Sequence, residues 1–176
     1  LTSVSANLAM HALPDALSAA FNTDSRLYRL QGEGATADLL VESWSQREGL
    51  SQPWELQIST LSTNARLDIR ALLGQRVTLL TQLADGRTEH PRSGLITAAS
   101  ALASDGGFAR YRLTVQPWLA LLAYGARSAV WQEKSVVEII DSVFGAYQQQ
   151  GGQHAAWTWS PCASAHLAQS QDRKST

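Results

Sequence analysis

Apolar and polar residues alternate along several stretches of this sequence, with a period of two. The alternation is clearest in residues 54–59, 76–83 and 111–115. A period of two places the apolar side chains on one face of an extended strand, so each stretch is expected to be a half-buried strand. The side chains expected on the inner faces are Trp54, Leu56, Ile58, Val77, Leu79, Thr81, Leu83, Tyr111, Leu113 and Val115.

Turn-forming sequences separate these stretches. Asp85 and Gly86 form a dipeptide typical of tight β-hairpins, because glycine accepts a positive φ, and the sequence ASDGG at 103–107 marks a second turn. Pro117 ends the last run, since proline has no N–H to donate to a neighbouring strand. Long strands joined by tight turns predict an antiparallel meander over residues 26–117, most simply a small β-barrel.

An earlier strand is expected to start at Leu39. Strict alternation places Leu40 and Trp44 on one face of it and Val41 on the other. Trp44 and Trp54 both alternate with polar residues. This pattern favours core packing over ligand stacking for these two tryptophans.

Short helices are predicted beside the strands. Asp68 is a suitable N-cap for a helical turn that ends at Gly74, where glycine tolerates a left-handed C-cap. The sequence WLALLAY at 118–124, which begins with Trp118, is expected to form a helix that stops at Gly125. The following residues, 126–134 with Trp131 among them, are compatible with one more strand.

A longer helix is predicted to begin after Ser135. Ser135 and Glu138, three residues apart, form a capping box, which stabilises a helix start by about 1 kcal/mol. The apolar residues that follow recur with helical spacing and define one face of the helix. They are Val136, Ile139, Ile140, Val143, Phe144 and Tyr147.

The sequence therefore divides into four segments. Residues 1–25 form an N-terminal segment with a short helix at 14–21, and residues 26–117 form the barrel. Residues 118–147 hold a linker helix, a strand and the capped helix, and residues 148–176 form a truncated tail that becomes polar from Ala165. The fold class is mainly β with α: an antiparallel β-barrel with an appended α/β element.

Composition excludes several kinds of protein. The 176 residues are 44% hydrophobic and 16% charged, as expected of a globular chain. Fourteen basic and fifteen acidic residues leave a net charge of -1, without the basic surface that nucleic acid requires. The longest apolar stretches fall far short of the roughly 20 residues of a membrane helix, and the N-terminus lacks the pattern of a secretory signal. We expect a cytoplasmic protein that neither binds nucleic acid nor inserts into membranes.

No arrangement of residues predicts catalysis, a cofactor or a metal site. The four histidines, His11, His90, His154 and His166, are widely separated and have no metal-ligand spacing. Nucleophile-elbow and phosphate-loop motifs are absent. Two alternatives remain open: a cysteine hydrolase built on Cys162 and His166, and a glycan- or small-molecule-binding barrel that uses Trp157 and Trp159, two residues apart on an expected edge strand.

Three sequence blocks carry a resemblance to a known family. These are residues 41–62 (VESWSQREGLSQPWELQISTLS), 69–80 (IRALLGQRVTLL) and 86–144, which runs from GRTEHP through VQPWLALLAYG to EIIDSVF. In the same order they resemble the N-terminal hub region of the VgrG spike proteins of type VI secretion, especially the Rhs/VgrG group. The resemblance covers roughly residues 21–147.

The resemblance implies a protein like the baseplate hub of contractile phage tails. In that family each chain builds two barrel-like tube domains, three chains form a pseudo-six-fold ring that docks on a hexameric Hcp tube, and a C-terminal β-helical needle completes the trimer. The implied role is structural, in the cytoplasm until the spike is expelled. Family members continue with a block resembling QYRE near the point where this sequence stops, so we expect a truncated chain.

In this interpretation Pro117 completes the first barrel, and the capped helix begins the neighbouring α/β element. A contractile phage or prophage hub is the alternative within the same class. The residues expected to form the structural core or the interfaces with partners are Trp44, Trp54, Pro117, Trp118, Trp131, Ser135, Glu138, Ile139, Ile140, Trp157 and Trp159.

Overall fold

The computed structural model describes residues 27–105, 107–126, 128–150 and 154–160. The chain divides after Pro117 into two compact units, an N-terminal and a C-terminal unit, which are treated separately below. The helix expected at 14–21, His11, Cys162 and His166 lie outside the described residues.

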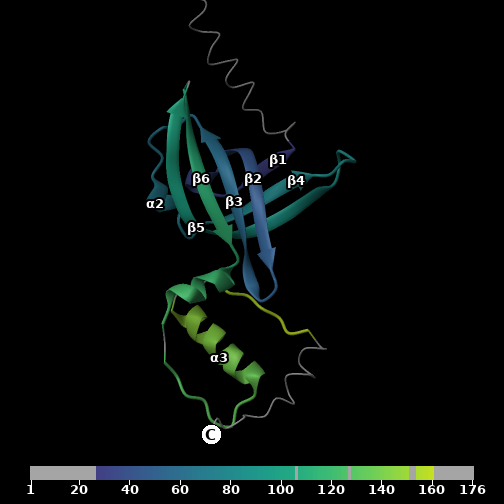
Figure 1. Ribbon diagram of the computed structural model, residues 1–176, viewed down its shortest axis with the longest axis vertical. Coiled ribbons are helices and arrows are strands. Elements are labelled where there is room, and N and C mark those ends of the chain that lie inside the picture. The colour runs from purple at the N-terminus through teal and green to yellow at the C-terminus, as the bar shows by residue number, and fades with distance from the viewer. Residues whose placement is uncertain (1–26, 106, 127, 151–153, 161–176) are drawn as a thin grey trace, which may run out of the picture. The chain divides into compact units, whose positions relative to one another are not determined.

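The N-terminal unit is a single antiparallel sheet of six strands (Figure 1). Its spatial order is β1-β4-β5-β6-β3-β2, and every neighbouring pair is antiparallel. A short 3₁₀ helix, η1 (Gly34–Thr36), and a helical turn, α2 (Ile69–Leu72), complete the unit. The strands are β1 (Tyr28–Gln31), β2 (Leu40–Gly49), β3 (Gln52–Ser62), β4 (Arg76–Gln82), β5 (Glu89–Asp105) and β6 (Phe108–Gln116).

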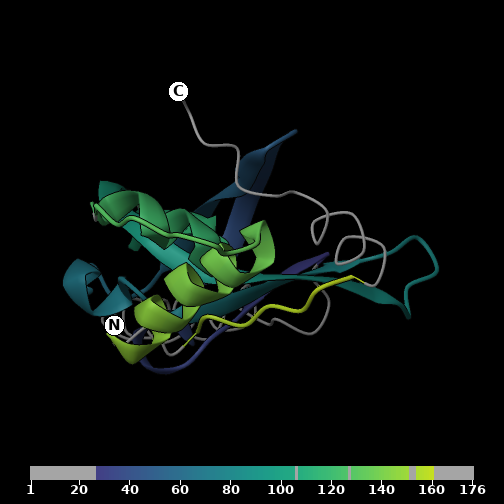
Figure 2. The same ribbon diagram turned by 90° about the horizontal axis from the view of Figure 1, so that it is seen from below.

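The sheet curves into a half-barrel, so the predicted mainly β fold class is confirmed. In Figure 1, β1 and β4 pass behind β2 and β3, and the tip of the β4–β5 hairpin projects to one side, as Figure 2 also shows. The two edge strands meet through side chains: the rings of Tyr28 on β1 and Trp44 on β2 lie 5.9 Å apart, edge to face. This contact brings the open edges of the half-barrel together.

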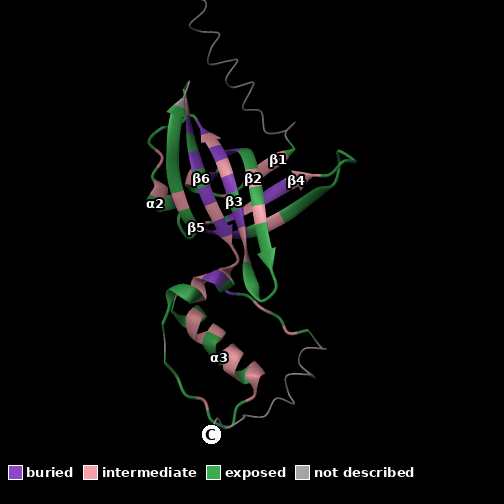
Figure 3. Cartoon of the chain, in the orientation of Figure 1, coloured by how far each residue is buried: buried purple, intermediate pink, exposed green. Residues whose placement is uncertain are grey.

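The concave side of the sheet holds the core. Figure 3 shows its buried residues concentrated on β3, β4 and β6. Trp44 and Trp54 pack against this core, as the sequence predicted. The core residues are Leu30, Leu39, Val41, Leu56, Ile58, Leu72, Val77, Leu79, Ile96, Ala109, Tyr111, Leu113 and Val115.

The faces predicted for the start of β2 are wrong. Pairing of β2 with β3 shifts register between Val41 and Ser43, which marks a β-bulge. A bulge inserts one residue and reverses the side on which the following residues point. Val41 therefore joins the core and packs on the same side as Trp44, although strict alternation placed it opposite.

The predicted turns and the first helix cap are present. Gly86 adopts a φ of +64°, and Asp85 Oδ1 accepts hydrogen bonds from the backbone N–H groups of Arg87 and Thr88, which fix the β4–β5 hairpin. Asp68 caps α2 by accepting from the N–H of Arg70 at 3.0 Å, and Gly74 follows with a φ of +77°. Local sequence therefore fixes these chain reversals.

The C-terminal unit contains η2, a 3₁₀ helix (Trp118–Tyr124), and α3, an α-helix (Val136–Gln149). The further strand expected within 126–134 does not form among the described residues of that stretch. Glu133 adopts a φ of +54°, which interrupts an extended run, and the described part of this unit offers no neighbouring strand for pairing. No helix in the described part of the chain is long and apolar enough to cross a membrane.

Candidate interaction surfaces

The start of α3 is fixed by the predicted capping box. The hydroxyl of Ser135 accepts from the N–H of Glu138 at 3.3 Å, and the N–H of Ser135 donates to Glu138 Oε2 at 2.7 Å. The Ser135 hydroxyl also donates to Glu138 Oε2 at 2.9 Å, and the two bonds that this carboxylate accepts, from the backbone N–H and then the hydroxyl of Ser135, hold the pKa of Glu138 below its ordinary value. The ionised carboxylate is therefore the form that stabilises the helix start.

An aromatic cluster lies against α3. The Trp118 ring packs edge to face on Phe144 at 4.9 Å and is stacked near Tyr147 at 5.9 Å. Trp157 packs against Phe144 at 5.1 Å and lies 6.2 Å from Trp118. Of the predicted interface residues, the structure thus brings Trp118 and Trp157 together, and Phe144 of the predicted helix face contacts both of them.

Asp141 anchors the chain segment that follows α3. Its Oδ1 accepts hydrogen bonds from the indole N–H of Trp157 at 2.7 Å and of Trp159 at 2.9 Å. Two further bonds, from Trp118 Nε1 to the carbonyl of Ala156 and from Gln148 Nε2 to that of Ala155, hold the same segment. We call residues 155–159 the strap.

The strap is not the edge strand expected for Trp157 and Trp159, because side-chain donors hold it to a helix and no strand neighbours it among the described residues. Sequence reasoning missed Asp141 because its partners lie 16 and 18 residues away. A sugar platform needs free ring faces and polar edges. Here both indole N–H groups are engaged within the chain, which weakens the glycan-binding alternative.

A mainly apolar groove of about 810 Å³ lies between η2, the residues after it and α3. Trp131, one of the predicted interface residues, lines it. Helix α3 has no fully buried residue: Ile139 and Ile140 are half-buried, and Val143 is 37% exposed. The lining residues are Leu121, Leu122, Tyr124, Gly125, Ala126, Ala129, Trp131, Ser142, Val143, Ala146, Tyr147 and Gln150.

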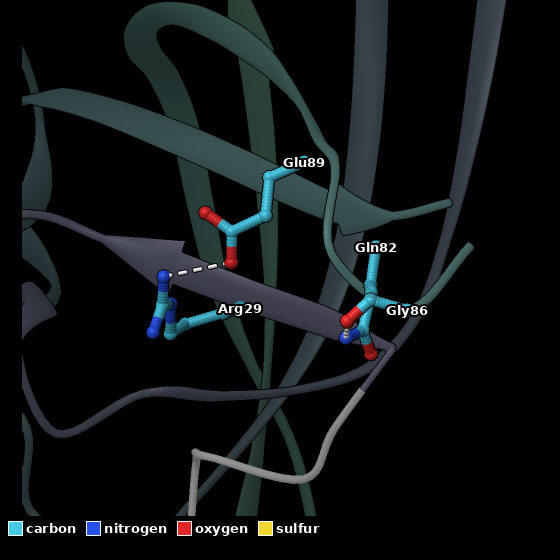
Figure 4. Close-up of polar contacts among 4 residues, drawn as sticks. All are labelled: Arg29, Gln82, Gly86 and Glu89. Carbon is cyan, nitrogen blue, oxygen red and sulfur yellow. Dashed lines mark hydrogen bonds and ion pairs between the residues drawn. The ribbon is translucent and has the colours of Figure 1, made fainter. Parts of the chain in front are cut away.

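Ion pairs and a hydrogen bond between side chain and backbone lie on the outer face of the half-barrel. Arg29 on β1 reaches past β4 to Glu89 on β5, with Nη2 2.8 Å from Oε1 (Figure 4). Beside it, Gln82 Nε2 donates to the carbonyl of Gly86 in the hairpin turn. A second ion pair joins Arg110 to Glu42 at 3.2 Å. All four charged side chains are partly exposed, so these pairs contribute little to stability.

No three metal-ligating side chains converge anywhere in the described residues. His90 is exposed in the N-terminal unit and His154 is half-buried in the C-terminal unit. The hydrolase alternative cannot be placed, since Cys162 and His166 lie outside the described residues. The surfaces that the structure does display are aromatic, apolar or ionic contact surfaces.

Comparison with known proteins gives consistent matches. The family model for the phage tail baseplate hub (GPD) matches residues 47–166. The type VI secretion system spike protein VgrG1b of Pseudomonas aeruginosa is 32% identical over 120 residues, which are 68% of this chain and 16% of that protein. VgrG1c of the same organism is 29% identical over 124 residues, covering 70% and 17%.

A solved structure also resembles the chain. The Escherichia coli c3393 protein, described as a component of the type VI secretion system with structural similarity to the T4 bacteriophage tail proteins gp27 and gp5, aligns with a TM-score of 0.60 and 25% identity. The alignment covers 69% of this chain and 32% of that structure. The chain spans 16–17% of the length of VgrG1b and VgrG1c, two of the relatives that it matches.

Proposed function

Since the chain belongs to the phage tail baseplate hub family, we propose that it forms a structural, non-catalytic part of the hub of a type VI secretion spike. The observation that carries this proposal is the extent of the family match. Residues 47–166 begin in β2, cross the division at Pro117 and include α3 and the strap. Both units therefore contribute residues to the matched hub region.

The relatives favour a secretion spike over a phage tail. VgrG1b and VgrG1c are both named as type VI spike proteins, and the c3393 protein is described as a component of the same system. The partners we propose are those implied by the resemblance: a hexameric Hcp-like tube, two further copies of the spike protein and the baseplate. In the same proposal the protein is cytoplasmic until the assembled spike is expelled.

The proposal gives the predicted residues packing roles. Trp44 and Trp54 maintain the half-barrel from inside. Ser135 and Glu138 position α3, and Trp118 and Trp157 hold the strap against it. The outer face of the sheet and the apolar groove beside Trp131 are then the surfaces available to the neighbouring proteins of the hub.

A chimaera tests the structural role. Residues 47–166 replace the matching region of VgrG1b in Pseudomonas aeruginosa, and release of the Hcp tube protein into the medium is measured. We expect release to be retained, because a hub segment acts through its shape and contacts. A chimaera carrying Gly94→Ala, which overpacks the barrel core, is expected to release less tube protein. A stable, soluble and trimeric chimaera that releases no tube protein contradicts the proposal.

A further inference from the structure

One cation on the inner side of the half-barrel lacks an anionic partner. Arg92 on β5 lies opposite Leu79 of β4, whose side chain is fully buried, so Arg92 also points to the concave face. Its Cζ lies 4.9 Å from the centroid of the Trp44 ring. Tyr28 packs against the same ring from β1. The guanidinium therefore sits at the seam where the edge strands β1 and β2 approach each other.

The charge of Arg92 is uncompensated among the described residues. The two ion pairs there, Arg29–Glu89 and Arg110–Glu42, do not include it. His90, two residues earlier on the same face, is exposed and adds no negative charge. Opposite His90, the hydroxyl of Thr81 is buried without a hydrogen-bond partner. Beside Arg92 the seam thus offers hydrogen-bond donors, and the carboxylate further along the same face of β2, that of Glu48, accepts a hydrogen bond from the side chain of Gln46.

Stacking on Trp44 prepares Arg92 to bind a carboxylate. A guanidinium that stacks on an aromatic ring keeps its N–H groups directed outward in its own plane, parallel to the ring, where two of them can bind one carboxylate. The surroundings are aromatic and contain one arginine. This composition suits a single carboxylate with an apolar neighbour better than a phosphate, which usually collects several cations.

The strand beside Arg92 has an unpaired edge. Within the described sheet β2 pairs with β3 alone and stands at the end of the strand order. Bulges interrupt its register between Val41 and Ser43 and between Arg47 and Gly49, but residues 43–47 are regular. The four residues of β1 reach it through a side-chain contact and no ladder. A regular stretch of this length accepts an added strand from another chain.

We propose that the seam between β1 and β2 binds an extended acidic segment of a partner protein. The segment adds to β2 along residues 43–47, and one of its carboxylates binds Arg92 above the Trp44 ring. Charge complementarity selects the occupant, because Arg92 lies against the Trp44 ring and has no ion-pair partner among the described residues. This inference goes beyond the proposed hub role and does not depend on it.

Peptide binding to the full chain tests the inference. The probe is a capped nine-residue peptide of alternating Thr and Val with a central Glu, and its counterpart has Gln at the centre. Binding is followed through the backbone amide resonances of β2 and the Nε–H resonance of Arg92. We expect the Glu peptide to bind about tenfold more tightly or better, since a bond to a charged partner exceeds a neutral one by roughly this amount.

Three variants sharpen the result. Arg92→Gln is expected to remove the preference for the Glu peptide. Arg92→Lys is expected to reduce it, because lysine keeps the charge but lacks the two parallel N–H donors of the guanidinium group. Arg112→Gln, which removes an exposed charge from β6, is expected to keep the preference. Equal binding of the two peptides to the unmodified chain, no binding of either, or shifts confined to other strands overturns the inference. These three outcomes are measured on the unmodified chain, so they do not depend on whether a variant folds.

Discussion

The indole ring of Trp54 lies directly over the backbone of Gly94. A Cβ at residue 94 would stand 2.7 Å from Trp54 Cη2, 2.7 Å from the carbonyl oxygen of Gln116 and 2.8 Å from a methyl of Val115. We therefore expect Gly94→Ala to lower the free energy of unfolding by about 1–3 kcal/mol, as overpacking of a core does. Urea denaturation followed by far-ultraviolet circular dichroism measures the loss.

Gly49→Ala is the matched control for this variant. Its added Cβ would meet only the flexible side chain of Gln52, at 3.5 Å or more, and Gly49 has no positive φ. We expect a change of no more than about 0.5 kcal/mol, as at ordinary surface positions. Equal stability of Gly94→Ala and Gly49→Ala would show that the packing of the Trp54 ring does not depend on the absence of a side chain at residue 94.

Tyr111 holds the loop after β3 against the core through two hydrogen bonds. Its ring is buried, and its hydroxyl donates to the carbonyl of Asn64 at 2.8 Å and accepts from the N–H of Leu67 at 3.2 Å. Tyr111→Phe leaves both backbone groups without this partner, so we expect a loss of roughly 1–3 kcal/mol. Tyr124→Phe, at a residue that is 75% exposed, is expected to change little. Equal melting temperatures for the two variants would contradict this role.

Local patterns predicted much of this fold because local physics determines it. The period of two identified the cores of β3, β4 and β6, and the Ser135–Glu138 spacing identified the start of α3. The bulge after Val41 was not predictable, since it arises from pairing with β3. Nor was the Asp141 anchor, whose partners are distant in sequence. The stretch 126–134 looked strand-like in isolation, but a strand forms only beside another strand.

The capping box makes α3 sensitive to Ser135. Ser135→Ala removes the hydroxyl that accepts from the N–H of Glu138, and we expect a cost of about 1 kcal/mol. Ser142→Ala, an exposed change in the middle of the same helix, is the control and is expected to be neutral or slightly stabilising. Amide hydrogen exchange of α3 reports the difference. Unchanged exchange of its first turn in Ser135→Ala would rule out the cap as a stabilising contact.

Glu138 gives the start of α3 a defined pH dependence. The hydrogen bonds from Ser135 lower the pKa of Glu138 from 4.5, so folding favours the ionised carboxylate. Its contribution is present above pH 4.5 and is lost as the pH falls through the lower, folded-state value. Titration of the carboxyl ¹³C resonance should give a midpoint below 4.5. Glu138→Gln, which can still cap, should remove this part of the pH dependence. A midpoint at or above 4.5 would contradict the assignment.

Asp141 should control whether the strap stays on α3. Asp141→Ala removes the oxygen that accepts from the indole N–H groups of Trp157 and Trp159, and we expect a loss of roughly 1–2 kcal/mol. Both indole N–H resonances should shift and exchange faster with solvent, whereas that of Trp118, bonded to the carbonyl of Ala156, should change less. Asp141→Asn keeps one acceptor oxygen and should give an intermediate result. If both resonances stay unchanged in Asp141→Ala, ring packing alone holds the strap.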